Sequence, residues 1–223
     1  MPIEKHVING ELRQKGKIAV LACGYDSAVG ALKAMRALTM GLAEHEVKLI
    51  VDAWRAANLH IVQLWANAEE AVIAAIPLRQ PVRLRNLRLT VESEILFIEL
   101  PSGRRLSYVQ LPLGENRWGS TSIAYTGTTT AQRWGQLETY GGKLVENIVQ
   151  TIARDLLVTG MHTVTDAGHK IVMHVHDEIV IDEPTESGLT VANTCELMST
   201  LPTWAEGFPL DVDRYECAYY HKD

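Results

Sequence analysis

Apolar residues recur at helical spacing through the first third of the chain. The stretches 11–23, 27–41, 44–57 and 59–76 each carry an apolar stripe with polar residues on the other side. Pro77 is expected to end the last stretch, because proline cannot continue the hydrogen-bond ladder of a helix. The pattern therefore predicts that the N-terminal part is almost entirely helical.

The pattern changes to the β type after this helical part. Residues 91–100, VESEILFIEL, are rich in β-forming residues, and the turn PSGR at 101–104 leads into a second strand, RRLSYVQL. Residues 112–135 are looser and rich in Gly and Thr, so the domain boundary is expected there. We accordingly divide the chain into residues 1–130 and residues 131–223.

The second part is predicted to be a compact α+β layer. Its expected elements are a helix, a β-hairpin, a helix and a strand, over residues 137–158, 170–182, 188–200 and 209–220. The two strands of the hairpin, KIVMHVHDEIVID, meet at His176 and Asp177. The predicted fold class is therefore α+β, with an antiparallel sheet packed by helices.

Composition narrows the class of protein. The 223 residues are 47% apolar and 22% charged, which excludes a disordered tail or a collagen-like repeat. No apolar run approaches the roughly 18 residues of a membrane span, and the N-terminus has no apolar core of a secretory signal. The cysteines Cys23, Cys195 and Cys217 form no CxxC pair. We therefore expect a reduced, cytoplasmic setting.

The charge is distributed unevenly along the chain. The net charge is −6, but residues 1–110 carry 14 Lys and Arg against 11 Asp and Glu, whereas residues 111–223 carry 7 against 16. The first half could meet phosphates and the second could hold cations in a carboxylate-rich site. Ordinary surface scatter of charge is the alternative interpretation.

The tip of the predicted hairpin, His176-Asp177-Glu178, is the first candidate for chemistry. Two adjacent carboxylates held at a rigid turn suit a hard divalent cation such as Mg²⁺, which leaves coordination positions open to substrate phosphates. A polar turn without function is the alternative. His174 and His176 point to one strand face and raise the possibility of a zinc site, but no other His or Cys lies at ligand spacing.

The first predicted helix carries the second candidate. Arg13, Lys17, Leu21 and Tyr25 advance by four residues and trace one helix face. Two cations could hold a triphosphate, and the aromatic ring could stack on a base. A solvated basic face that runs into a buried tyrosine is the alternative.

Together, these motifs resemble family A DNA polymerases, the bacterial polymerase I type. The stretch RQKGKIAVLACGY is similar to motif B on the fingers helix of that family, and MHVHDEIVID is similar to motif C. Between them, LPSGRRLSY and WGQLETYGGKLVENIVQTIARDLL resemble the phage branch. The resemblance covers essentially the whole chain and implies a fingers subdomain at 1–130 and the C-terminal part of the palm at 131–223.

The resemblance implies roles for residues that contact the nucleotide. Arg13 would hold the terminal phosphates of a deoxynucleoside triphosphate. Lys17 would contact the phosphates and donate a proton to pyrophosphate, and Tyr25 would lie at the fingers pivot. This sequence departs from the family at Leu21, where Phe or Tyr influences sugar discrimination, and at Asp26, where Gly is usual.

The resemblance also implies roles for residues that contact metal and DNA. Asp177 would be one of the aspartates that bridge two Mg²⁺ ions in nucleotidyl transfer, and Glu178 would be a supporting catalytic carboxylate. His176 would touch the primer end. Glu146 stands where the family has a Gln that reads the minor groove, and its charge is a departure from the pattern.

Two family elements do not occur in these 223 residues. Motif A, an Asp-Tyr/Phe-Ser-x-x-Glu segment with the other metal aspartate, precedes motif B in the family, as does the thumb. We therefore expect a C-terminal polymerase fragment, inactive alone, whose partners are primer–template DNA, deoxynucleoside triphosphates and a separate chain with motif A. A non-catalytic prophage remnant that binds nucleotide or DNA weakly is the alternative. An incomplete palm sheet also makes self-association plausible.

Overall fold

The computed structural model describes residues 44–115, 121–184 and 186–220, together with residues 23–26 and Gly10, Arg13, Gly16, Lys17 and Val20. The predicted helix at 27–41 lies outside the described residues. The chain forms two compact units: unit 1 comprises Met1–Glu99 and Arg105–Ile148, and unit 2 comprises Leu100–Arg104 and Val149–Asp223. The assignment of fingers and palm to residues 1–130 and 131–223 stays a prediction.

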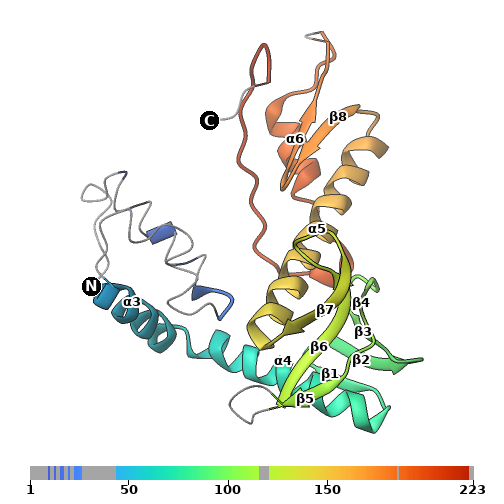
Figure 1. Ribbon diagram of the computed structural model, residues 1–223. Coiled ribbons are helices and arrows are strands. Elements are labelled where there is room, and N and C mark those ends of the chain that lie inside the picture. Colours follow the sequence, from blue (N-terminus) through green and yellow to red (C-terminus); the bar gives the residue numbers. More distant parts are fainter. Residues whose placement is uncertain are drawn as a thin grey trace. The chain divides into compact units, whose positions relative to one another are not determined.

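The predicted α+β class is confirmed, and every strand pairing in the described part is antiparallel. Helices α3 (Glu44–Ala57) and α4 (Leu59–Leu78) lie where the apolar periodicity predicts them (Figure 1). The indole rings of Trp54 and Trp65 stack with centroids 5.8 Å apart and join the two helices. Pro77 lies in the last turn of α4, one residue before the helix ends.

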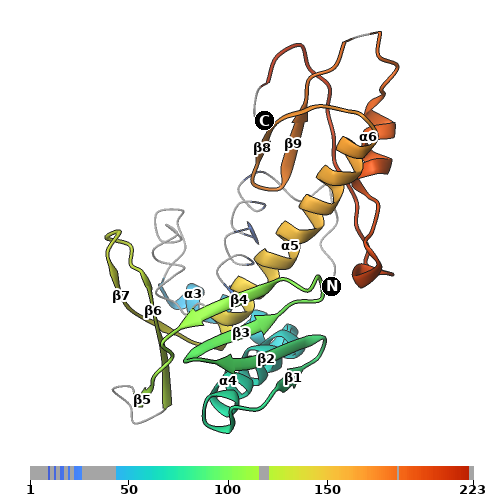
Figure 2. The same cartoon turned by 90° about the vertical axis from the view of Figure 1, so that its right-hand side faces the viewer.

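Helix α4 packs along β1 and β2 of the sheet in unit 1 (Figure 2). Its buried side chains are Trp65, Ala68, Ala71, Val72 and Ala75. By length and composition α4 could cross a membrane, so the expectation that no stretch reaches that length is wrong on this measure. Helix α4 packs against the sheet on one side, carries Glu69 and Glu70 in mid-helix, and has 28% of its most apolar stretch buried.

Unit 1 contains a seven-stranded sheet in the order β1-β2-β3-β4-β6-β5, with β7 paired to β6. The strands are β1 (Val82–Leu84), β2 (Leu87–Glu92), β3 (Ile95–Glu99), β4 (Arg105–Val109), β5 (Leu113–Glu115), β6 (Thr121–Thr128) and β7 (Trp134–Thr139). Leu89, Leu96 and Ile98 are almost fully buried on one face of this sheet, whereas alternate residues of the same strands face outward.

Two expectations for this region are wrong. Residues 91–100 do not form one strand, because Ser93 and Glu94 adopt φ values of +48° and +66° and turn β2 back into β3. The stretch 112–135 is not loose, because it contains β5, β6 and the start of β7. The first error arises because the turn is made without glycine. The second arises because the strands of this stretch are rich in Thr and Gly.

Helix α5 (Gly141–Asp166) begins in unit 1 and continues into unit 2. The predicted helix 137–158 was placed too early, since residues up to Thr139 belong to β7. In unit 2, Arg104 and Ser102 of the β3–β4 turn bond the two carboxylate oxygens of Asp155, each at 2.6 Å. The turn PSGR is thereby attached to the second half of α5.

The rest of unit 2 contains the hairpin β8 (Ile171–Val175) and β9 (Glu178–Ile181), helix α6 (Val191–Met198) and the 3₁₀ turn η3 (Thr203–Ala205). The hairpin and α6 confirm the predicted elements. The expected strand at 209–220 is wrong, because these residues form no strand in the described structure. No residue of β8 or β9 is fully buried, and the apolar side chains of Val172 and Met173 are exposed on this hairpin. Self-association through this face stays a prediction.

Candidate functional site

The first group of candidate residues lies on the N-terminal helix of unit 1. Arg13 and Lys17 are helical and exposed, and their spacing of four residues places them one turn apart on the same side. Val20 is 58% exposed on the next turn, whereas Cys23 is only 1% exposed. Arg13 and Lys17 therefore share one exposed side of the helix, as their spacing predicts. Leu21 lies outside the described residues, and Tyr25 lies in the turn after the helix rather than on its face.

This helix ends in a turn at Tyr25 and Asp26, and both residues are half-buried. Asp26 has a φ of +58°, in the left-handed region that favours glycine. Glycine, which the resemblance implies at this position, would adopt this backbone conformation with less strain. Here the Asp26 carboxylate instead accepts a 2.7 Å hydrogen bond from the guanidinium of Arg55 in α3.

Burial raises the pKa values of two groups at this turn, the Asp26 carboxyl and the Cys23 thiol. Desolvation raises the pKa of Asp26 above its ordinary value, although Arg55 acts to lower it and Glu69 acts to raise it. Since the folded-state pKa is raised, this group's contribution to stability is present below the ordinary pKa of aspartate and is lost as the pH rises through the raised value. Burial likewise raises the pKa of the Cys23 thiol, against the opposing effect of Arg55.

Two glycines at the start of α5 let the turn approach that helix. A Cβ atom on Gly142 would lie 2.4 Å from the carbonyl oxygen of Tyr25 and 2.3 Å from Cβ of Asp26. A Cβ on Gly141 would lie 2.1 Å from the carbonyl oxygen of Trp65, and the Gly141 amide donates to Glu69 at 2.9 Å. The backbone of α5 is thus in contact with both α4 and the Tyr25 turn.

Glu146 follows on the first turns of α5. Its carboxylate accepts a 2.7 Å bond from Lys143, and its side chain is 24% exposed. The neighbouring Asn147 donates to the Tyr108 hydroxyl at 2.9 Å. The negative charge that departs from the family pattern is therefore partly neutralised within the helix.

The second group of candidate residues lies at the β8–β9 hairpin of unit 2. Val175 pairs with Glu178, which leaves His176 and Asp177 as a two-residue turn. His176 has a φ of +53°, and both turn residues are exposed. The predicted hairpin tip is confirmed for Asp177, whereas Glu178 is half-buried and begins β9.

Tyr220 contacts Glu178 directly. The Tyr220 hydroxyl donates a 2.8 Å hydrogen bond to the Glu178 carboxylate, and this bond is the main cause that raises the pKa of Tyr220. No local sequence pattern indicates this pair, because 42 positions separate the two residues. Through this hydrogen bond, the C-terminal segment contacts Glu178, a candidate catalytic residue.

We expect the Tyr220–Glu178 hydrogen bond to be lost at alkaline pH. A raised folded-state pKa means that the contribution of the bond is complete below about pH 10, the ordinary value for tyrosine, and is lost as the pH rises through the raised value. A spectrophotometric titration of tyrosinate should show a late component that Tyr220→Phe removes and Glu178→Gln shifts to lower pH. Identical titrations of Glu178→Gln and the parent chain would contradict the contact.

The described residues do not make up a metal site on their own. No three His, Cys, Asp or Glu side chains in the described part lie close enough to hold a metal ion. Asp177 offers one exposed carboxylate, and Glu178 is bonded to Tyr220. His174 lies 3.5 Å from the Arg154 guanidinium, so nothing in this part of the chain supports a zinc site at His174 and His176.

The structure thus brings Arg13 and Lys17 together in unit 1, and His176, Asp177 and Glu178 together in unit 2. The roles of all these residues stay predictions. The sequence did not indicate Gly141, Gly142 or Tyr220. The GG pair directly before a strong helix pattern was the available signal for a close backbone contact.

A comparison with known proteins agrees with the motifs. The chain is 47% identical to a DNA polymerase of Bacillus phage SP02 over 226 aligned positions, which cover 100% of this chain. The chain is similar to a DNA polymerase segment. The predicted resemblance to a phage DNA polymerase is therefore confirmed, and the alignment covers 35% of the phage protein. No family model and no solved structure matches the chain.

Proposed function

We propose that this chain supplies the nucleotide-binding helix and one catalytic hairpin of a family A DNA polymerase, acting in the cytoplasm on primer–template DNA. The identity to the SP02 DNA polymerase along the whole chain carries the proposal. The exposed cations of unit 1 and the exposed Asp177 of unit 2 support it, since nucleotidyl transfer needs both a phosphate clamp and metal-binding carboxylates.

The helix of unit 1 is suited to hold a triphosphate. Arg13 and Lys17 extend from one side of a helix into solvent, where they can donate several charge-assisted hydrogen bonds to phosphate oxygens. Lys17 would also hold the proton that the departing pyrophosphate takes up. Tyr25 lies in the turn directly after this helix and would act as its pivot beside the new base pair.

The hairpin of unit 2 would hold one side of the metal site. Mg²⁺, when bound, neutralises charge on the reacting phosphates. Asp177 would be one of its ligands, with Glu178 as a nearby supporting carboxylate, and the remaining protein ligands would come from outside the described residues. His176, beside Asp177 at the turn, would contact the primer end, and Glu146 would face the DNA with its charge reduced by Lys143.

A hybrid polymerase tests this proposal. The matching segment of the SP02 polymerase is replaced by this chain, and primer extension is measured with Mg²⁺ and all four deoxynucleoside triphosphates. We expect template-directed extension by the hybrid. A folded hybrid that binds primer–template without extending it would instead favour the non-catalytic remnant.

The 223 residues alone are expected to extend no primer. The physical reason is that Asp177 is the one exposed carboxylate of the described β8–β9 hairpin, whereas two-metal transfer needs a second metal-binding aspartate. The measurement is the same assay with the purified chain. Extension that Asp177→Ala abolishes would show that this chain contains a complete site.

Nucleotide binding is expected to depend on both cations of the helix. Each charge-assisted contact contributes about 1.5–3 kcal/mol, so Arg13→Ala or Lys17→Ala should weaken binding of a deoxynucleoside triphosphate roughly 10- to 100-fold. Calorimetric titration of the 223-residue chain at low salt measures the effect. Lys48→Ala, which removes an exposed lysine of α3, is the matched control. Equal weakening by all three variants would contradict a specific phosphate clamp.

A further inference from the structure

The end of α4, together with β1 and most of β2, forms a segment of unit 1 that is rich in arginine and contains no acidic residue. Residues 71–91 contain four arginines and no Lys, Asp or Glu. These are Arg79, Arg83, Arg85 and Arg88. All four are exposed, and no side-chain hydrogen bond or ion pair joins any of them to the rest of the described chain. Their charge is therefore available to a ligand.

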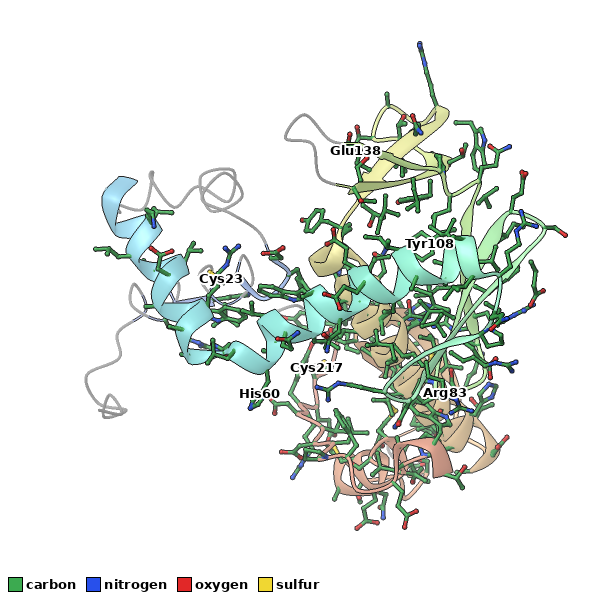
Figure 3. All side chains as sticks on the ribbon, turned by 90° about the horizontal axis from the view of Figure 1, so that it is seen from below. Cys23, His60, Arg83, Tyr108, Glu138 and Cys217 are labelled. Atoms are coloured by element: carbon green, nitrogen blue, oxygen red, sulfur yellow. The ribbon has the colours of Figure 1, made fainter. Side chains whose placement is uncertain are left out.

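The strand pairing concentrates this charge on one face. Arg83 of β1 pairs directly with Arg88 of β2, and both lie on the side opposite to the buried Leu84 and Leu89 (Figure 3 labels Arg83). Like charges directly opposite each other in a sheet are destabilising. The facing pair Arg83 and Arg88 is thus a cost to the fold, which Glu99 on the other side of Arg88 offsets in part and a bound anion would reduce further.

The same row continues across the sheet. Arg88 pairs with Glu99 of β3, which pairs with Arg105 of β4. Arg105 lies 4.1 Å above the ring of Phe97 and bonds Glu92 at 3.1 Å. We call Arg83, Arg88, Arg105 and Phe97 the arginine face. It combines two arginines without a side-chain partner in the described chain, Arg83 and Arg88, with the stack of Arg105 on Phe97. The Glu99 carboxylate lies between these two parts on the same sheet surface.

The turn between β1 and β2 adds a fourth arginine at a strained position. Arg85 has a φ of +52°, in the left-handed region where glycine is favoured in a two-residue hairpin turn. An arginine at this position does not improve the turn. It does extend the positive charge of the arginine face to the end of the hairpin.

We propose that the arginine face binds a single strand of nucleic acid, with phosphates on Arg83 and Arg88 and a base stacked at Arg105 and Phe97. Planar guanidinium groups match phosphates in a two-pronged geometry, and neighbouring strands about 4.8 Å apart present them in a row. An acidic peptide would use the charges but not the aromatic ring, whereas a flexible single strand uses both. This proposal does not depend on nucleotidyl transfer by Asp177.

Fluorescence anisotropy of a labelled thymidine oligonucleotide tests the proposal with the 223-residue chain. The double variant Arg83→Gln/Arg88→Gln should bind at least tenfold more weakly. For this variant, the slope of log Kd against log salt concentration should be shallower by about 1.4, because each phosphate contact on a single strand contributes roughly 0.7 to the slope. The control is Lys48→Gln/Arg133→Gln, which removes the same charge from exposed positions elsewhere in unit 1.

Thermal unfolding separates binding from folding. Removing the facing charges should leave the melting temperature of the double variant unchanged or raise it, and Arg85→Gly should raise it while weakening oligonucleotide binding. Equal affinities of the double variant and the control would overturn the proposal. So would a polyglutamate peptide of matched charge that displaces the oligonucleotide as effectively as unlabelled thymidine strands do. A uridine oligonucleotide in the same assay distinguishes DNA from RNA as the source of the strand.

Discussion

In the hybrid polymerase, Asp177→Asn should lower the rate of nucleotide incorporation about a thousandfold, equivalent to roughly 4 kcal/mol of transition-state stabilisation. Asp177 is an exposed carboxylate at a two-residue turn whose neighbours are fixed by the pairing of Val175 with Glu178. The substitution removes the charge that a divalent cation requires but keeps the size of the side chain. Single-turnover incorporation with saturating nucleotide measures the loss.

The matched control for this variant is Asp182→Asn. Asp182 is exposed directly after the other end of β9, so the same charge is lost a short distance from the turn. We expect the control to retain nearly the full rate. Similar rates for Asp177→Asn and the parent hybrid would remove Asp177 from the metal site, whatever the sequence resemblance implies.

The substitution Gly142→Ala should have the largest effect on stability. The added Cβ would lie 2.4 Å from a backbone oxygen of Tyr25, so α5 or the turn must move. We expect the free energy of unfolding to fall by about 3 kcal/mol and the melting temperature to fall by roughly 6–12 °C. The displaced turn should also weaken nucleotide binding at the preceding helix. Thermal unfolding followed by circular dichroism measures the first effect.

Gly16→Ala is the control for this second prediction, with the opposite sign. Gly16 is helical and exposed, and no atom lies within 4 Å of the position of an added Cβ. Alanine there should stabilise the helix by about 1 kcal/mol. If both substitutions changed the melting temperature alike, the close contact of α5 with the Tyr25 turn would be wrong.

The helices of unit 1 could be predicted because their signal is local. The apolar stripe of 44–57 and of 59–76 gave α3 and α4 to within two residues, with Pro77 near the end. The β2–β3 turn was missed because Ser93 and Glu94 adopt positive φ without being Gly or Asn. Such turns are fixed by the pairing of the strands around them, which a local pattern does not contain.

In the candidate site, too, local features could be predicted and long-range contacts could not. The sequence indicated Arg13, Lys17 and Asp177 as candidate residues because their chemistry and spacing are local. Gly142 and Tyr220 were not, since their importance depends on contacts with Tyr25 and Glu178, residues distant in sequence. The expected strand at 209–220 failed for a related reason. A β pattern yields a strand only where a partner edge is present to accept its hydrogen bonds.

We propose that the helix of Arg13 and Lys17 and the hairpin of Asp177 serve one nucleotidyl-transfer site. Iron-directed cleavage of the hybrid polymerase tests it, with Fe²⁺ in place of Mg²⁺ so that hydroxyl radicals cut the backbone near the bound metal. With primer–template and the correct nucleotide, we predict cuts both at the β8–β9 turn and in the helix at Lys17, and Asp177→Asn should remove both. Cuts at the β8–β9 turn alone, with the nucleotide bound, would contradict a shared site.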